Sequence, residues 1–198
     1  MSQDQKKQLE QQLWNIANTL RGKMDADEFR DYILGFIFFK YLSERMRLYG
    51  DKLLKEDGIN YTDINENTAD GKEYIQLIEK EALSKLGYFL KPTELFSVIS
   101  AKGNSQSGGN TSILEDLGDI LNSIESSTMG TESQDDFGKL FEDIDLTSSK
   151  LGRTDEQRNK LISKVLYHLD QIDFQLANTE IDVLGDAYEY LISQFASG

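Results

Sequence analysis

The sequence contains no cysteine, a single proline and a single histidine among its 198 residues. Without cysteine, disulfides, zinc–thiolate sites and cysteine nucleophiles are excluded. The near absence of proline, together with the scarcity of alternating β-branched residues, favours helices over strands. No segment reaches the ~20 apolar residues that a membrane span requires, and the N-terminal residues lack the apolar core of a signal peptide. We therefore expect a helical cytoplasmic protein with no membrane partner.

Groups that carry catalysis are also scarce. The only histidine, His168, falls inside a predicted helix, where a structural or surface role is expected. Carboxylates are numerous, but they are spread along predicted helix surfaces and no pair has the spacing of an acid–base or metal site. The glycine-rich stretch 102–112 neither follows a strand nor ends in Gly-Lys-Ser/Thr, so a surface loop is predicted in place of a phosphate-binding loop. The residues alone predict a noncatalytic domain with no catalytic, cofactor-binding or metal-binding side chains.

Residues 32–42 are apolar around nearly the whole helical circumference. A helix of this kind must be surrounded by other helices or lie in a membrane, and eleven residues interrupted by Lys40 are too short to cross a bilayer. Ahead of this segment, Gly22 is placed to end the first helix, and Asp25 with Glu28 forms an acidic capping box that begins the next one. We predict a buried central helix that packs in an antiparallel pair with the helix before it.

The remaining periodicity predicts further helices along the chain. A third helical run is expected over residues 43–55, and others over 72–86, 113–124 and 181–195. Thr154 and Gln157 form a capping box for a helix that extends to Leu169. The predicted fold is all-α, with at most a minor pair of short strands near residues 88–90.

The formal net charge of −14 opposes broad nucleic-acid binding by this chain alone, because phosphate contacts need clustered lysine and arginine. The charge is uneven, however. Residues 1–50 hold eight Lys or Arg and seven Asp or Glu, which leaves about −15 for residues 51–198. Any surface that faces DNA or a partner is therefore expected on the first two helices. The main candidates are Arg21, Lys23, Arg30 and Arg45, with Lys40 and Arg47 nearby, and the alternative is that they are ordinary solvated charges.

Several blocks of the chain together resemble one protein family. The first block comprises Leu13-Trp14, Ala17 and LRGKMDADEFRDYILGFIFFKYLSE; the others are GYFLKP, DFGKLFEDIDLTSSKLG and IDVLGDAYEYLISQFASG. In this order they resemble the modification (M) subunit of type I restriction-modification systems, across essentially the whole chain. In that family a glycine-rich segment, the cofactor glycines and the Asn-Pro-Pro-Tyr/Phe motif for the target adenine come next, and none of them is present here.

The resemblance implies a multi-helix globular domain over residues 1–150, followed over residues 151–198 by the lead-in helices of a truncated methyltransferase domain whose core is absent. It also implies that the full-length protein is an adenine-N6 DNA methyltransferase that uses S-adenosyl-L-methionine. The implied partners are a specificity (S) subunit, a second M subunit, a restriction (R) subunit and duplex DNA. This part would then serve DNA clamping and subunit assembly. One alternative is a module that contacts only proteins. A second alternative is a protein that mimics DNA, which is less favoured because the acidic residues are spread over the chain.

We predict that the chain by itself has no methyltransferase activity and does not bind S-adenosylmethionine, because the family's cofactor and adenine motifs are expected beyond Gly198. Calorimetric titration with S-adenosylmethionine should give no binding heat. A micromolar dissociation constant would show that the cofactor site has been placed wrongly.

Overall fold

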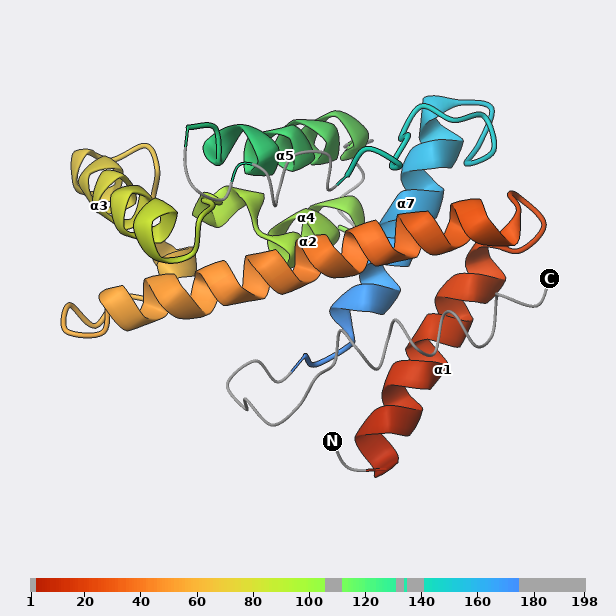
Figure 1. Cartoon of the computed structure of the whole chain (residues 1–198), viewed down its shortest axis with the longest axis horizontal. Coiled ribbons are helices and arrows are strands. Elements are labelled where there is room, and N and C mark those ends of the chain that lie inside the picture. The colour runs from red at the N-terminus through yellow and green to blue at the C-terminus, as the bar shows by residue number, and fades with distance from the viewer. Residues whose placement is uncertain (1–2, 106–111, 131–133, 135–140, 175–198) are drawn as a thin grey trace.

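The computed structural model describes residues 3–105, 112–130, 134 and 141–174 (Figure 1). These residues form six α-helices and two 3₁₀ helices, without a strand among them, so the predicted all-α fold is confirmed. The elements in chain order are α1 (Gln3–Leu20), α2 (Ala26–Leu53), η1 (Tyr61–Asp63), α3 (Ala69–Lys85), η2 (Pro92–Glu94), α4 (Phe96–Gly103), α5 (Leu114–Ser127) and α7 (Asp155–Asp170).

The turn between α1 and α2 has the local structure that its sequence predicts. Gly22 adopts a positive φ of 78°, which places it in the left-handed region that favours glycine. The Asp25 carboxylate accepts a hydrogen bond from the Glu28 backbone N–H at 2.9 Å, and the Glu28 carboxylate accepts one from the Asp25 N–H at 3.3 Å. This reciprocal capping box fixes the first residue of α2.

Helix α2 is the central element, and the prediction that residues 32–42 are buried is confirmed. Ile33, Phe36 and Phe39 have no exposed surface, whereas Phe38 is the exception with 40% exposed. The separate helix predicted over residues 43–55 is wrong, because α2 continues without interruption for 28 residues. No proline or capping residue ends the helix after residues 32–42. Extending a helix costs less free energy than starting a new one.

The first two helices do not form the predicted antiparallel pair. After the turn they diverge, and the main neighbour of α1 is α7, which runs beside it (Figure 1). The apolar stripe of α1 is buried there, in the core to which the inward residues of α7 belong. The stripe consists of Leu9, Leu13, Ile16 and Leu20, each at most 3% exposed. The short connection fixes only the adjoining ends of the two helices. The direction in which α1 packs is set by its apolar stripe, which matches that of α7.

Helices α3, α4 and α5 pack on the remaining sides of the core, and the predicted stripe of α5 is buried. Residues 88–90, where short strands were allowed, are irregular and buried. The Tyr88 hydroxyl donates to the backbone oxygen of Leu42 at 2.7 Å, and the Tyr61 hydroxyl donates to that of Leu90. The first bond holds the segment against α2, and the second holds it against η1.

Helix α7 begins at Thr154, whose side chain accepts from the Gln157 N–H at 3.2 Å. The Gln157 side chain accepts from the N–H of Arg153, one residue before the atom that a full capping box uses. Val165, Leu166 and other inward residues of α7 share one hydrophobic core with α1, α2, α4 and α5. The packing therefore has no break at the domain boundary expected between residues 150 and 151. The helix predicted over residues 181–195 and most of the loop 102–112 lie outside the described residues.

We expect Phe36→Ala to lower the free energy of unfolding by about 3–5 kcal/mol, because it opens a cavity beneath a side chain with no exposed surface. The matched control is Phe38→Ala, which removes the same atoms from the same helix at a site that is 40% exposed. Its effect should be about 1 kcal/mol or less. Urea titrations of both variants measure the difference, and equal losses would contradict the central position of α2.

Candidate functional site

The turn between α1 and α2 presents two of the predicted cations together. Arg21 and Lys23 are both exposed, and neither makes an ion pair with a carboxylate in the described part of the chain. The Arg21 guanidinium lies 5.0 Å from the centre of the Trp14 ring, which is itself 37% exposed. This cation–π contact restrains Arg21 without neutralising its charge. The turn thus presents two exposed cations that make no ion pair with the described residues, beside the capping carboxylates of α2.

The other two predicted candidates do not join this turn. Arg30 is half-buried between two carboxylates, at 3.2 Å from Asp27 and 3.7 Å from Asp31, so its charge is largely offset. Burial raises the pKa of the Asp31 carboxyl in spite of the arginine beside it. Arg45 is exposed, but it lies about 30 Å along α2 from the turn. The four candidates are thus placed at separate points along the first two helices.

Lys40, which the charge pattern placed near this surface, is buried, and that expectation is wrong. Its side chain is 2% exposed and its ammonium pairs with Glu44 one turn further along α2. The ammonium also lies 4.9 Å from the Phe174 ring and 5.7 Å from the Phe96 ring. Burial raises the pKa of the Glu44 carboxyl. Lys40 therefore joins α2, α4 and the segment after α7 inside the core and cannot face a ligand.

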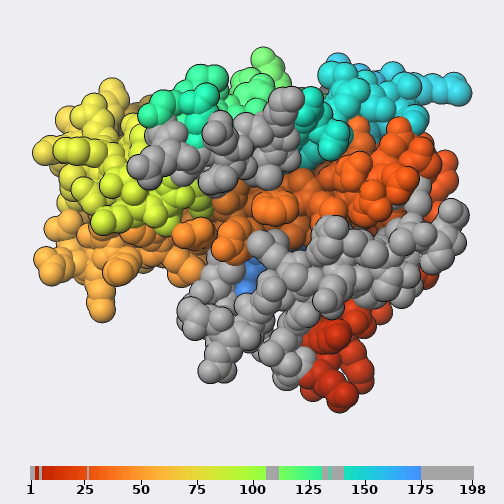
Figure 2. Space-filling view, viewed as in Figure 1, coloured from red at the N-terminus to blue at the C-terminus, as the bar shows by residue number. Residues whose placement is uncertain are grey.

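Sequence reasoning missed a further lysine near the turn. The Tyr32 hydroxyl donates to the backbone oxygen of Asp145, and Lys150 pairs with Glu28 at the start of α2. Figure 2 shows the cyan surface of the segment that contains these residues beside the orange surface of α2, at one end of the molecule. Lys150 thus lies near the α1–α2 turn, with its charge paired to that of Glu28. No spacing rule in the sequence relates residues so far apart.

The described residues offer no catalytic or metal-binding arrangement. His168 is partly buried, its ring packs edge-on against Tyr167 at 5.7 Å, and burial lowers its pKa. Within the described part of the chain, no group of three or more histidine or carboxylate side chains is placed to hold a metal ion. None of the described helices is long and apolar enough to cross a membrane.

A family model described as the HsdM N-terminal domain matches residues 9–169. The chain belongs to this family. The match begins in α1 and ends in the last turn of α7, so it covers the helices that share the core. The resemblance to the type I modification subunit that the sequence blocks indicated is confirmed.

Two relatives of this HsdM N-terminal domain are much longer than the chain. The type I restriction enzyme MpnII methylase subunit of Mycoplasma pneumoniae is 32% identical over 196 residues, which cover 98% of this chain and 36% of that protein. The crystal structure of a type I restriction-modification system methyltransferase subunit from Streptococcus thermophilus matches with a TM-score of 0.75 at 33% identity. That match covers 98% of this chain and 39% of the other. The chain thus spans less than half the length of either relative.

For this HsdM N-terminal domain we predict opposite effects for removing the whole buried ion pair and for removing one of its partners. Replacing Lys40 and Glu44 together by methionine removes both charges and keeps the core filled, so the free energy of unfolding should stay unchanged or rise by about 1–4 kcal/mol. Glu44→Met alone leaves the Lys40 ammonium buried without its carboxylate and should lower the free energy of unfolding by about 3–5 kcal/mol. Chemical denaturation orders the three proteins. A large loss of stability in the double variant would show that the ion pair is net stabilising.

Proposed function

We propose that the chain is the N-terminal helical part of the modification subunit of a type I restriction-modification enzyme. The full-length protein would be a site-specific adenine-N6 DNA methyltransferase that uses S-adenosyl-L-methionine. Membership of the HsdM N-terminal domain family supports this proposal, as do two longer relatives named as methylase or methyltransferase subunits. The described residues contain no strand and hence no glycine-rich strand-to-helix turn of the kind that nucleoside cofactors bind. We therefore assign cofactor binding to no residue of this chain.

We further propose that this domain helps the assembled enzyme to close around duplex DNA. Methylation of an adenine inside a duplex requires the base to be turned out of the stack, and the duplex must be held while this happens. The observation that carries the proposal is that two exposed cations at the α1–α2 turn, Arg21 and Lys23, make no ion pair with the described residues, in a chain with a net charge of −14. Such side chains contact phosphates and position a duplex without reading its sequence.

The packing of α7 suggests how the domains are divided. Because α7 shares its core with α1, α2, α4 and α5, we propose that the helical domain includes residues 151–170 and that the methyltransferase domain begins after them. The partners would be a specificity subunit, which carries the DNA target, a second modification subunit and a restriction subunit.

A purely protein-binding role is the second candidate, and one observation favours it. Apart from the turn, six basic side chains of the described residues are already paired with carboxylates of the same chain. These pairs are Arg30 with Asp27 and Asp31, Lys40 with Glu44, Arg47 with Asp51, Lys102 with Asp116, Lys150 with Glu28, and Arg158 with Asp155. The exposed Trp14 beside Arg21 is also a pair of residue types that recurs at the centre of protein interfaces.

The experiment replaces Arg21 and Lys23 together by glutamate in the assembled enzyme. If these side chains contact phosphates, DNA affinity should fall and the dependence of log K on log salt should flatten by about 1.8 for each modification subunit in the enzyme, since each lost contact removes about 0.9 from the slope. The matched control is Lys52→Glu with Lys55→Glu, which changes charge equally at the far end of α2. This control should bind DNA with the original salt dependence.

Each result separates the two functions. Normal assembly with weaker, less salt-dependent binding supports the DNA clamp. Failure of the double variant to assemble with the specificity subunit, while its circular dichroism remains native, supports the protein-binding role. Normal assembly together with normal DNA binding would contradict both roles for the turn.

A further inference from the structure

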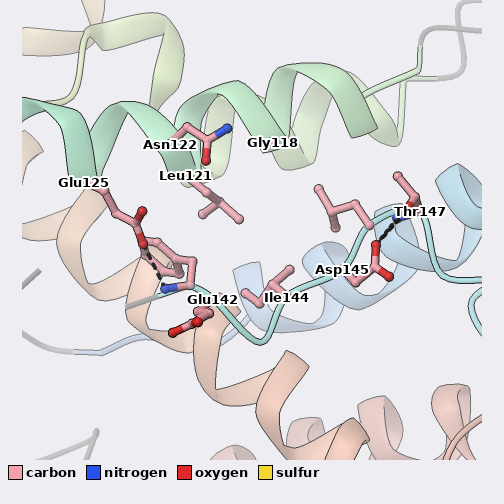
Figure 3. Close-up of a pocket in the computed structure, with 10 residues that line it drawn as sticks. Gly118, Leu121, Asn122, Glu125, Glu142, Ile144, Asp145 and Thr147 are labelled. Carbon is pink, nitrogen blue, oxygen red and sulfur yellow. Dashed lines mark hydrogen bonds between the residues drawn. The ribbon is translucent and has the colours of Figure 1, made fainter. Parts of the chain in front are cut away.

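A groove runs between α5 and the segment 141–147 (Figure 3). Helix α5 lies away from α1 (Figure 1). The groove has a volume of about 520 Å³. Figure 3 shows Leu121 projecting from α5 toward the facing segment, to which Ile144 and Asp145 belong. The apolar residues that line the groove are Leu121, Phe141, Ile144 and Leu146.

The wall opposite α5 is held in place by contacts to two helices. The Phe141 N–H donates to the Glu125 carboxylate at 3.3 Å, which ties the segment to α5. On the other side, Ile144 packs against Gly35 of α2 so closely that an added Cβ would lie 2.2 Å from its Cδ1 atom. The Tyr32 hydroxyl bonds the backbone of Asp145. The groove therefore exists before any partner arrives and does not need to be opened.

The charged residues that line the groove in the described part of the chain are all acidic. Helix α5 and residues 141–147 contain seven carboxylates and no lysine, arginine or histidine. Glu125, Glu142 and Asp145 line the groove itself. The Asp145 carboxylate accepts from the N–H and the hydroxyl of Thr147, and these bonds lower its pKa, so it stays ionised. Of the seven, only Asp116 pairs with a cation in the described part of the chain, the ammonium of Lys102.

We propose that this groove binds a lysine- and arginine-rich amphipathic helix of a partner protein. An apolar floor with a rim of one charge is complementary to a helix that carries leucine-like residues on one face and cations along its sides. The identification of that protein as another subunit of the enzyme rests on the assembly role proposed above, but the groove itself does not. A duplex or a second copy of this chain, at −14, would be repelled by the same rim.

The test titrates the isotope-labelled chain with a synthetic 14-residue helix of lysine and leucine and follows amide chemical shifts. The changes should be confined to α5 and residues 141–147. A glutamate–leucine helix of the same pattern should cause none. Glu142→Lys should weaken binding of the basic peptide about five- to tenfold, and Glu142→Gln should weaken it less, because Glu142 is exposed and faces the groove without holding the wall.

The control variant is Glu73→Lys, on the outer face of α3, where an exposed carboxylate lies beside Tyr74 and Leu77. It reverses one charge equally and should leave the affinity unchanged. Chemical-shift changes that extend over α3 as well as α5, or an equal loss of peptide affinity in Glu73→Lys, would mean that the acidic chain attracts the basic peptide nonspecifically. Either result would overturn the proposal. Self-association that depends on Glu142, or equal shifts with a DNA duplex, would also overturn it.

A photo-crosslinking residue in place of Asn122 then identifies the natural occupant in the purified, assembled enzyme. It should link to a helix of net positive charge in another subunit, and the same residue in place of Gln76 on α3 should not. If the enzyme assembles but residue 122 forms no crosslink, the occupant of the groove is not another subunit. That result does not affect the DNA-clamp proposal. Failure of the Arg21 and Lys23 experiment would leave the peptide titration unaffected, so the two proposals fail separately.

Discussion

The structure depends on the burial of α2 on almost every side. A helix with Ile33, Phe36 and Phe39 fully covered needs neighbours around it, and α3, α4, α7 and η1 supply them. The irregular segment over residues 88–90 is then fixed by the hydroxyls of Tyr61 and Tyr88, one of which bonds the backbone of α2 itself. Burial raises the pKa of both tyrosines far above the ordinary value, so these donors stay protonated at any physiological pH. The apolar circumference of one helix thus dictates where the other helices lie.

A single ion pair interrupts this apolar environment, and its geometry explains why the core accepts it. The Lys40 ammonium has its carboxylate partner on the same helix, so no other element must be positioned to neutralise it. Phe96 and Phe174 cover it with the faces of aromatic rings, which attract a cation. A hydrocarbon side chain of similar length would fill the space with no desolvation of charge. What the lysine adds is a directional contact to the segment that follows α7.

Local signals in the sequence predicted the start of α2 and the burial of its centre but not how the helices pack. The capping box of Asp25 and Glu28 and the burial of residues 32–42 follow from side chains within one or two turns, and both are confirmed. The pairing of α1 with α7 depends on the match of two stripes more than a hundred residues apart, which periodicity cannot supply. For the same reason charge counting placed the buried Lys40 on the surface and missed the pairing of Lys150 with Glu28. The groove beside α5 was not predicted, because it depends on how segment 141–147 packs against α5 and α2.

The pairing of the first helix with the last described one has a consequence for synthesis. Helix α1 leaves the ribosome before the other described helices, yet its apolar stripe has its main neighbour in α7, which begins 135 residues after α1 ends. At the usual elongation rates, α1 waits roughly 7–27 s with Leu9, Leu13, Ile16 and Leu20 in contact with water. During that interval the nascent chain offers a binding site to any chaperone that captures short apolar helices. Fusion of a bulky domain at the N-terminus would prolong the search of α1 for its partner and would lower the yield of folded protein more than the same fusion at the C-terminus.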